Sequence, residues 1–130
     1  MENAAQICFT DSLDNAYFRN KFEGELDKFK GNKGIGVISD TDPQPMVMKT
    51  KLGKYAIVTV AKFNNLEEVE QEYIASGGHL SELSSGKTSQ TELIGLLISQ
   101  GNSFKEGIEI VYQKLKGSFS ALLLTKDGII

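Results

Sequence analysis

The chain has one cysteine and one histidine, Cys8 and His79, which are the residue types of a thiol–imidazole catalytic pair. A nucleophilic thiol needs a nearby base, and nothing in the spacing of these two residues brings them together. Cys8 lies between Ile7 and Phe9, as a buried apolar thiol would, and His79 follows a glycine pair typical of a helix end. The residue types therefore predict no catalytic group, no internal disulfide and no metal site built mainly from histidine and cysteine.

The loop Ser85-Gly86-Lys87-Thr88 imitates the end of a phosphate-binding loop and precedes an expected helix. In such loops backbone N–H groups surround the phosphates, while the lysine and the hydroxyl residue contact phosphate and Mg²⁺. The first glycine of the motif would fall on Ser81, and the preceding HLSEL segment is a poor buried strand. Nucleotide binding through Gly86, Lys87 and Thr88 is therefore an alternative, and a polar loop with a helix cap explains the same residues.

Two other motifs fit structural roles. The glycines of GNKGIG at 31–36 precede a strand, whereas a dinucleotide fingerprint has its glycines after a strand and before a helix. The pair Glu67-Glu68 falls in the first turn of an expected helix, where the helix dipole favours carboxylates. Neither motif indicates a binding or catalytic site.

The composition is that of one globular domain. The 130 residues are 40% hydrophobic and 24% charged, with a net charge of −3. An acidic chain without a basic stretch is a poor candidate for binding nucleic acid or an anionic membrane. No apolar run approaches the ~20 residues of a membrane span, and the first residues lack the basic start of a signal peptide. We therefore expect a cytoplasmic protein.

The hydrophobic patterning predicts an α+β domain over residues 15–130, after a leader of uncertain order at 1–14. A helix is expected from residue 15, because Phe18, Phe22, Leu26 and Phe29 recur at helical spacing. Three further helices are expected after the capping residues Asn65, Ser89 and Ser103, each followed by a glutamate three residues later. Strands are expected at 34–39, 46–49, 54–62 and 119–125.

The apolar residues of two of these helices define the expected buried stripes. They are Leu66, Val69, Tyr73 and Ile74 in the first, and Phe104, Ile108, Val111, Tyr112 and Leu115 in the second.

A hairpin is expected at the end of the chain. Lys126-Asp127-Gly128 is a turn signal, and Ile129-Ile130 begins a partner strand. A partner of two residues leaves most of that edge of the strand at 119–125 unpaired, so the chain looks cut. A further apolar face is expected along Ile57 and Val58. We therefore expect self-association, or association with the rest of a parent protein.

Four segments in order resemble the glutaminase domain of amidophosphoribosyltransferases, which are class II, N-terminal-nucleophile glutamine amidotransferases of purine synthesis. The segments are GNKGIGVISDTDPQP (31–45), KYAIVTVAKFNNLEEVEQE (54–72), SSGKTSQTELIGLLIS (84–99) and LKGSFSALLLTKDGII (115–130). The resemblance implies a layered sandwich of helices on sheets of the N-terminal-nucleophile hydrolase type, here incomplete.

The resemblance also implies where the pocket residues of the family would fall. The arginine that holds the glutamine carboxylate falls on Ser39, the Asn-Gly pair of the oxyanion hole on Val60-Ala61, and the aspartate that holds the substrate amino group on Gln90. The family nucleophile is an N-terminal cysteine followed by glycine, whereas this sequence begins with Met1. Loss of one oxyanion donor alone lowers the rate about 10²–10³-fold, so the pocket reads as degenerate.

The sequence thus leads to one main hypothesis and two alternatives. The main hypothesis, which rests on the resemblance, is a degenerate glutaminase-like domain of an amidophosphoribosyltransferase-type protein without glutaminase activity or a cofactor. Whether the protein is an enzyme stays open. The alternatives are a small nucleotide-binding module and an interaction domain whose open sheet edge takes a partner strand.

Overall fold

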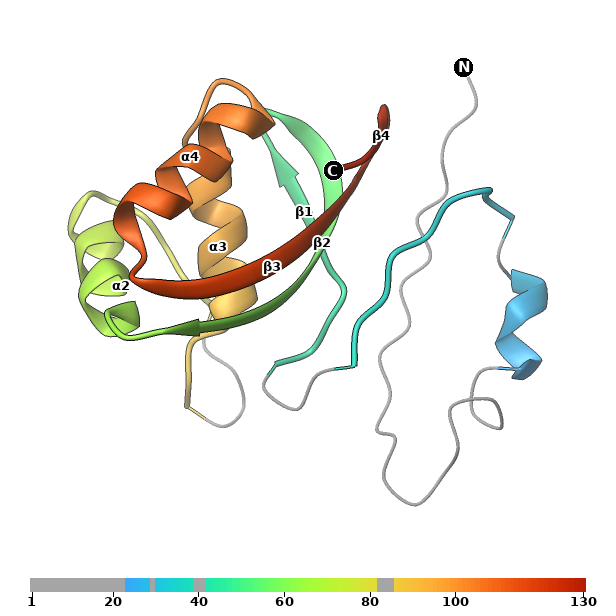
Figure 1. Ribbon diagram of the computed structural model, residues 1–130, viewed down its shortest axis with the longest axis horizontal. Coiled ribbons are helices and arrows are strands. Elements are labelled where there is room, and N and C mark those ends of the chain that lie inside the picture. The colour runs from blue at the N-terminus through green and yellow to red at the C-terminus, as the bar shows by residue number, and fades with distance from the viewer. Residues whose placement is uncertain (1–22, 29, 39–41, 82–85) are drawn as a thin grey trace.

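A computed structural model describes residues 23–28, 30–38, 42–81 and 86–130 (Figure 1). These residues form an α+β fold with one antiparallel sheet, whose strands lie in the order β1-β2-β3-β4. The elements are the 3₁₀ helix η1 (Glu23–Lys28), β1 (Met46–Thr50), β2 (Gly53–Phe63), α2 (Leu66–Ala75), α3 (Gln90–Ser99), α4 (Phe104–Lys114), β3 (Gly117–Thr125) and β4 (Gly128–Ile129).

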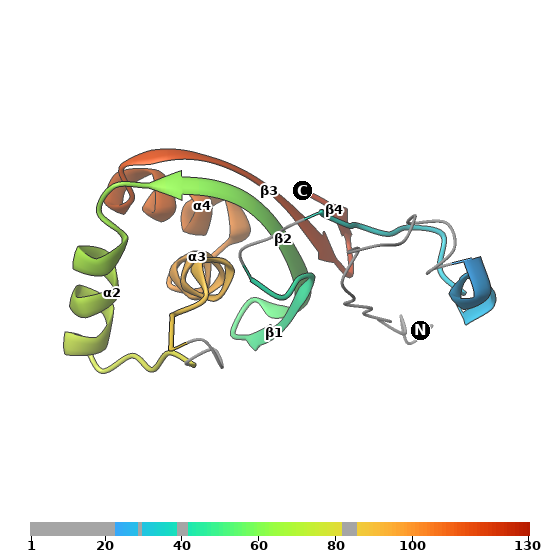
Figure 2. The same ribbon diagram turned by 90° about the horizontal axis from the view of Figure 1, so that it is seen from below.

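The helices α3 and α4 cover one face of the sheet. In Figure 2, β2 and β3 arch over these two helices, and α2 lies at one end of the arch. The hydrophobic core fills this layer, because α3 is apolar on most sides and the strands turn alternate residues toward it. Its fully buried residues are Tyr55, Ile57, Leu93, Ile94, Leu97, Ile98, Val111 and Leu123.

Two close contacts fix the position of α3. The Tyr55 hydroxyl on β2 donates to the Gly95 carbonyl at 2.7 Å, and burial raises the pKa of this phenol, so it stays a neutral donor. On the other side of α3, a Cβ at Gly107 of α4 would collide with the backbone of Ile98. The lack of a side chain at Gly107 therefore lets α3 and α4 approach closely.

Two of the three predicted helix caps are confirmed. The hydroxyls of Ser89 and Ser103 accept hydrogen bonds from the amides of Glu92 and Glu106, at 3.2 and 3.1 Å. Asn65 is the N-cap residue of α2, as predicted, but the expected capping hydrogen bond is wrong, because its side chain makes no bond to α2. Asn65 instead donates to the Lys114 carbonyl and accepts from the Lys116 amide, both at 2.8 Å, which ties α2 to the connection between α4 and β3.

The predicted buried stripes are correct only in part. Val69, Val111 and Leu115 are buried, and their stripe neighbours Leu66, Tyr73, Phe104 and Ile108 pack partly buried against the core. Ile74 is 50% exposed and Tyr112 is 68% exposed, so the prediction is wrong for these two. Tyr112 lies beside Phe119 at the sheet margin instead, with their ring centroids 5.0 Å apart.

The N-terminal part departs most from the predictions. Of the helix expected from residue 15, the described residues 23–28 form a 3₁₀ helix. The predicted strand at 34–39 is wrong over its described residues, because 34–38 lie in no strand and the described sheet ends at β1. The leader at 1–14, with Cys8, lies outside the described residues.

The C-terminal hairpin is confirmed. Thr125 pairs with Gly128 and Leu124 with Ile129, and Leu123 and Ile130 exchange two backbone hydrogen bonds of 2.9 Å. No helix in the described part of the chain has the length and apolar character needed to cross a membrane.

Candidate functional site

Of the four positions that the resemblance assigns to the substrate pocket, Val60, Ala61 and Gln90 lie among the described residues. Gln90 is the first residue of α3, and its side-chain amide donates to the Ala61 carbonyl on β2 at 3.0 Å. Val60, the neighbour of Ala61, faces the other side of the sheet and is 63% exposed. The structure therefore brings Gln90 and Ala61 together and turns Val60 away. Ser39 lies outside the described residues.

A carboxylate from a distant segment also lies at the start of α3. One oxygen of Asp42, Oδ2, accepts from the Ser89 hydroxyl at 2.6 Å and from the Thr91 amide at 3.0 Å. The Thr91 amide is one of the first N–H groups of α3, which have no partner within the helix, and the positive end of the helix dipole favours an anion at this point. Asp42 thus stabilises α3 from 47 residues away along the chain.

Gln44 connects the same carboxylate to the sheet. Its side-chain amide donates to Asp42 Oδ1 at 3.1 Å and to the Thr59 carbonyl at 3.0 Å, and its oxygen accepts from the Thr59 amide at 2.7 Å. Met46 pairs with Ile57, so the same register would place residue 44 opposite Thr59. The Gln44 side chain thus takes up the backbone hydrogen-bonding groups of Thr59 and extends the ladder of β2 beyond β1.

A hydroxyl pair closes this set of contacts. The Oγ1 atoms of Thr59 and Thr91 lie 2.7 Å apart, and Thr91 is fully buried. We call Asp42, Gln44, Thr59, Ser89 and Thr91 the α3 network. Buried polar groups need partners, and within this network each of these side chains has one. The Ser89 hydroxyl is 1% exposed and donates to a carboxylate, so it is not accessible as a nucleophile.

The structure disfavours phosphate binding at the loop before α3. The Thr88 hydroxyl donates to Glu70 on α2 at 2.6 Å, and Asp42 already accepts from the Thr91 amide. A phosphate at this helix start would therefore lie near two carboxylates. Gly86 has a φ of +76° and Lys87 is exposed, as expected for a polar loop, and Ser85 lies outside the described residues.

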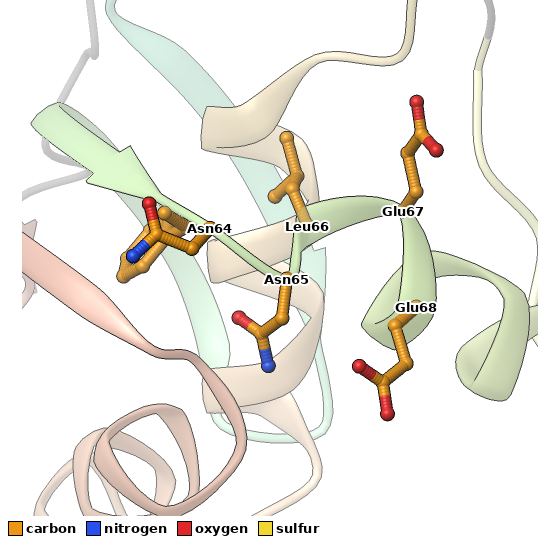
Figure 3. Close-up of a pocket in the computed structure, with 6 residues that line it drawn as sticks. Asn64, Asn65, Leu66, Glu67 and Glu68 are labelled. Carbon is orange, nitrogen blue, oxygen red and sulfur yellow. The ribbon is translucent and has the colours of Figure 1, made fainter.

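A surface depression at the start of α2 also lacks the features of a binding site. It is lined by Phe63, Asn64, Asn65, Leu66, Glu67 and Glu68. Figure 3 shows Asn64, Glu67 and Glu68 pointing in different directions, whereas ligand sites converge a few polar groups on one point.

The described residues hold no group of three histidine, cysteine or acidic side chains that could bind a metal ion. His79 is exposed.

The contacts of Asp42 and Gln44 were not predicted. The composition of the segment Thr41-Asp42-Pro43-Gln44-Pro45 predicts only a turn. No local pattern indicates these contacts, because the partners of Asp42 lie 47 and 49 residues away and that of Gln44 lies 15 residues away.

Two solved structures share this fold. One is a glutamine phosphoribosylpyrophosphate (PRPP) amidotransferase from B. subtilis complexed with ADP and GMP, with a TM-score of 0.58 and 24% identity over 79% of this chain. The other is described as the allosteric regulatory enzyme of purine biosynthesis, with a TM-score of 0.52 and 23% identity over 64% of this chain.

This chain spans only 23% and 17% of the lengths of those two chains. The class that the fold defines is therefore a domain similar to part of a PRPP amidotransferase chain. No protein-family model and no curated protein sequence matches this chain.

Replacing Asp42 with alanine should destabilise the fold. The change leaves the Ser89 hydroxyl and the Thr91 amide without their carboxylate acceptor at a buried helix start. Loss of such a partner costs about 1–3 kcal/mol. We expect the free energy of unfolding, measured by urea titration, to fall by about this amount in Asp42→Ala, and by less in Asp42→Asn, which keeps one acceptor oxygen.

The matched control is Asp27→Ala, which removes an exposed carboxylate from η1. This variant should change the free energy of unfolding by less than about 0.5 kcal/mol. An equally small effect in Asp42→Ala would show that the α3 network does not stabilise the fold.

ATP with Mg²⁺ should leave the melting temperature of the chain unchanged, because Asp42 and Glu70 place negative charge at the loop before α3. A ligand at 100 times its dissociation constant would stabilise the fold by about 2.7 kcal/mol. Differential scanning fluorimetry detects such a shift. A clear rise that is lost in Lys87→Ala would establish nucleotide binding at this loop.

Proposed function

We propose that this chain is a glutaminase-like domain of an amidophosphoribosyltransferase-type protein of purine nucleotide biosynthesis, and that it does not hydrolyse glutamine. The observation that carries the first half is the shared fold with the B. subtilis PRPP amidotransferase over 79% of this chain. The four resembling segments support the same assignment, because they occur in the order of the glutaminase domain.

The contacts of the pocket positions support the proposal that the chain does not hydrolyse glutamine. The Gln90 amide donates to the Ala61 carbonyl, so its N–H group is directed at the backbone. A substrate amino group needs an acceptor at this position, and an aspartate would supply one. Val60 has an apolar side chain and supplies no side-chain donor for an oxyanion.

The hydroxyls at this site are also unsuited to nucleophilic attack. An acyl-enzyme needs an accessible thiol or hydroxyl beside a base. Ser89 and Thr91 are buried, and each is hydrogen-bonded within the α3 network. The network holds α3 against β2, and the hydroxyls of its own members are not available for chemistry. The role of the domain is therefore structural within the larger protein.

The isolated chain should release no ammonia from L-glutamine above the buffer rate. The measurement is a glutamate dehydrogenase-coupled ammonia assay, with an active class II glutamine amidotransferase as the positive control. Cys8→Ala is the matched variant, because Cys8 is the single thiol of the chain. Ammonia release that disappears in Cys8→Ala would contradict the absence of glutaminase activity.

An assay of PRPP consumption tests the family assignment and the absence of glutaminase activity separately. It uses the protein purified from its source cells with an antibody against this chain. We expect it to consume PRPP with free ammonia and not with glutamine. No PRPP consumption would contradict the assignment to an amidophosphoribosyltransferase-type protein. Consumption driven by glutamine would contradict the absence of glutaminase activity alone.

A further inference from the structure

The chain separates its charges along the sequence. Residues 43–66, which contain the β1–β2 hairpin, include four lysines and no acidic residue. Residues 63–86, which contain α2, include five glutamates and no lysine or arginine. The hairpin is thus a basic element and α2 an acidic one, although the net charge of the whole chain is only −3.

Two lysines of the hairpin lack a counter-charge. Lys49 and Lys54 are exposed cross-strand partners, and like charges directly opposite each other destabilise a sheet. Neither side chain forms a salt bridge or a hydrogen bond with any residue in the described part of the chain. The other lysines of this stretch differ: Lys51 donates to the Gln100 carbonyl at 3.2 Å, and Lys62 lies at the far end of β2.

Two glutamates at the start of α2 lack a counter-charge in the same way. Glu67 and Glu68 are exposed, and neither side chain has a salt bridge or hydrogen bond among the described residues. The other glutamates of α2 have partners, because Glu70 accepts a hydrogen bond at 2.6 Å and Glu72 lies 3.4 Å from the Lys114 ammonium. The helix dipole favours carboxylates in this first turn, but it leaves their outer surface open to a cation.

These two sets of charges lie beyond opposite ends of β2. Lys54 is the second residue of the strand, and α2 begins three residues after the strand ends at Phe63. Nine residue steps separate Lys54 from Phe63, which is roughly 30 Å in an extended strand. In Figure 2, β2 runs along the arch and ends beside α2. A lysine and a glutamate side chain do not bridge this distance, so the four charges cannot pair within one copy of the chain.

We propose that the Lys49–Lys54 pair of one copy of this chain binds Glu67 and Glu68 of a second copy. The two surfaces are complementary in charge, and each copy carries both of them, so every copy makes the contact through both ends. Such a contact joins two different surfaces and removes the repulsion within each pair. Exposed ion pairs are individually weak, so the association depends on salt and on protein concentration. The proposal does not depend on the proposed function.

Sedimentation equilibrium of the full-length chain over a concentration series measures this association. At about 0.01 M salt charges interact over about 30 Å, and at about 1 M salt over about 3 Å. We expect the chain to self-associate at the lower salt concentration. The dissociation constant should rise by about tenfold or more at the higher one, because the contact consists of exposed ion pairs.

Charge-reversal variants assign the association to these four residues. Lys49→Glu/Lys54→Glu and Glu67→Lys/Glu68→Lys should each stay monomeric at low salt, because both ends of the copy then carry the same sign. An equimolar mixture of the two variants should associate, because each supplies the charges that the other lacks. The variant that combines all four changes keeps the net charge of −3 and should self-associate like the unchanged chain. Circular dichroism checks that each variant is folded.

The matched control is Lys30→Glu/Lys33→Glu, which changes the net charge by the same amount as the hairpin variant, at two exposed residues outside the sheet. It should keep the self-association. Loss of association in this control as complete as in the hairpin variant would assign the effect to net charge and overturn the proposal. A chain that is monomeric at low salt, folded variants that fail to associate when mixed, or association that persists in both charge-reversal variants would also overturn it.

Discussion

The Asp42 carboxylate is the contact on which the arrangement of this domain depends. It joins the segment before β1 to the start of α3 through Ser89 and Thr91, and Gln44 passes the connection on to Thr59 in β2. The other end of α3 is held through Ser99, whose hydroxyl lies 3.1 Å from that of Tyr55, and Tyr55 also donates to the Gly95 carbonyl in the middle of the helix. Because both ends are fixed by specific hydrogen bonds, the apolar residues of α3 meet the sheet in one register.

Local signals predicted most elements from the sequence. Ser89 and Ser103 cap their helices because the acceptor and the donor lie three residues apart. Asn65 has the same spacing, yet its partners lie 49 and 51 residues away, and no local pattern encodes them. Residues 34–38 have strand-like composition, but a strand needs a partner, and sequence alone does not show whether one is in place.

The candidate site was predictable in its positions and not in its contacts. The resemblance to the glutaminase domain pointed to Gln90 and Ala61, and the structure joins them by a hydrogen bond. The α3 network was not foreseen, because its members come from three separate segments. The two sides of β2 then differ in kind: polar groups on the helix side are hydrogen-bonded to one another, and the opposite side is apolar. On that opposite side Val60 is 63% exposed, but Val58 is buried, and Ile57 is buried on the helix side, so the exposed apolar face expected along Ile57 and Val58 is wrong for both residues.

Hydrogen exchange at the amides of Thr59 and Thr91 tests most directly whether the α3 network holds the fold together. Each amide donates to a side chain, Gln44 or Asp42, so its protection reports on the network itself. We predict that both amides exchange only through global unfolding, with the denaturant dependence of the slowest core amides. Exchange as fast as that of the amides of residues 33–38, which lie in no strand, would contradict it.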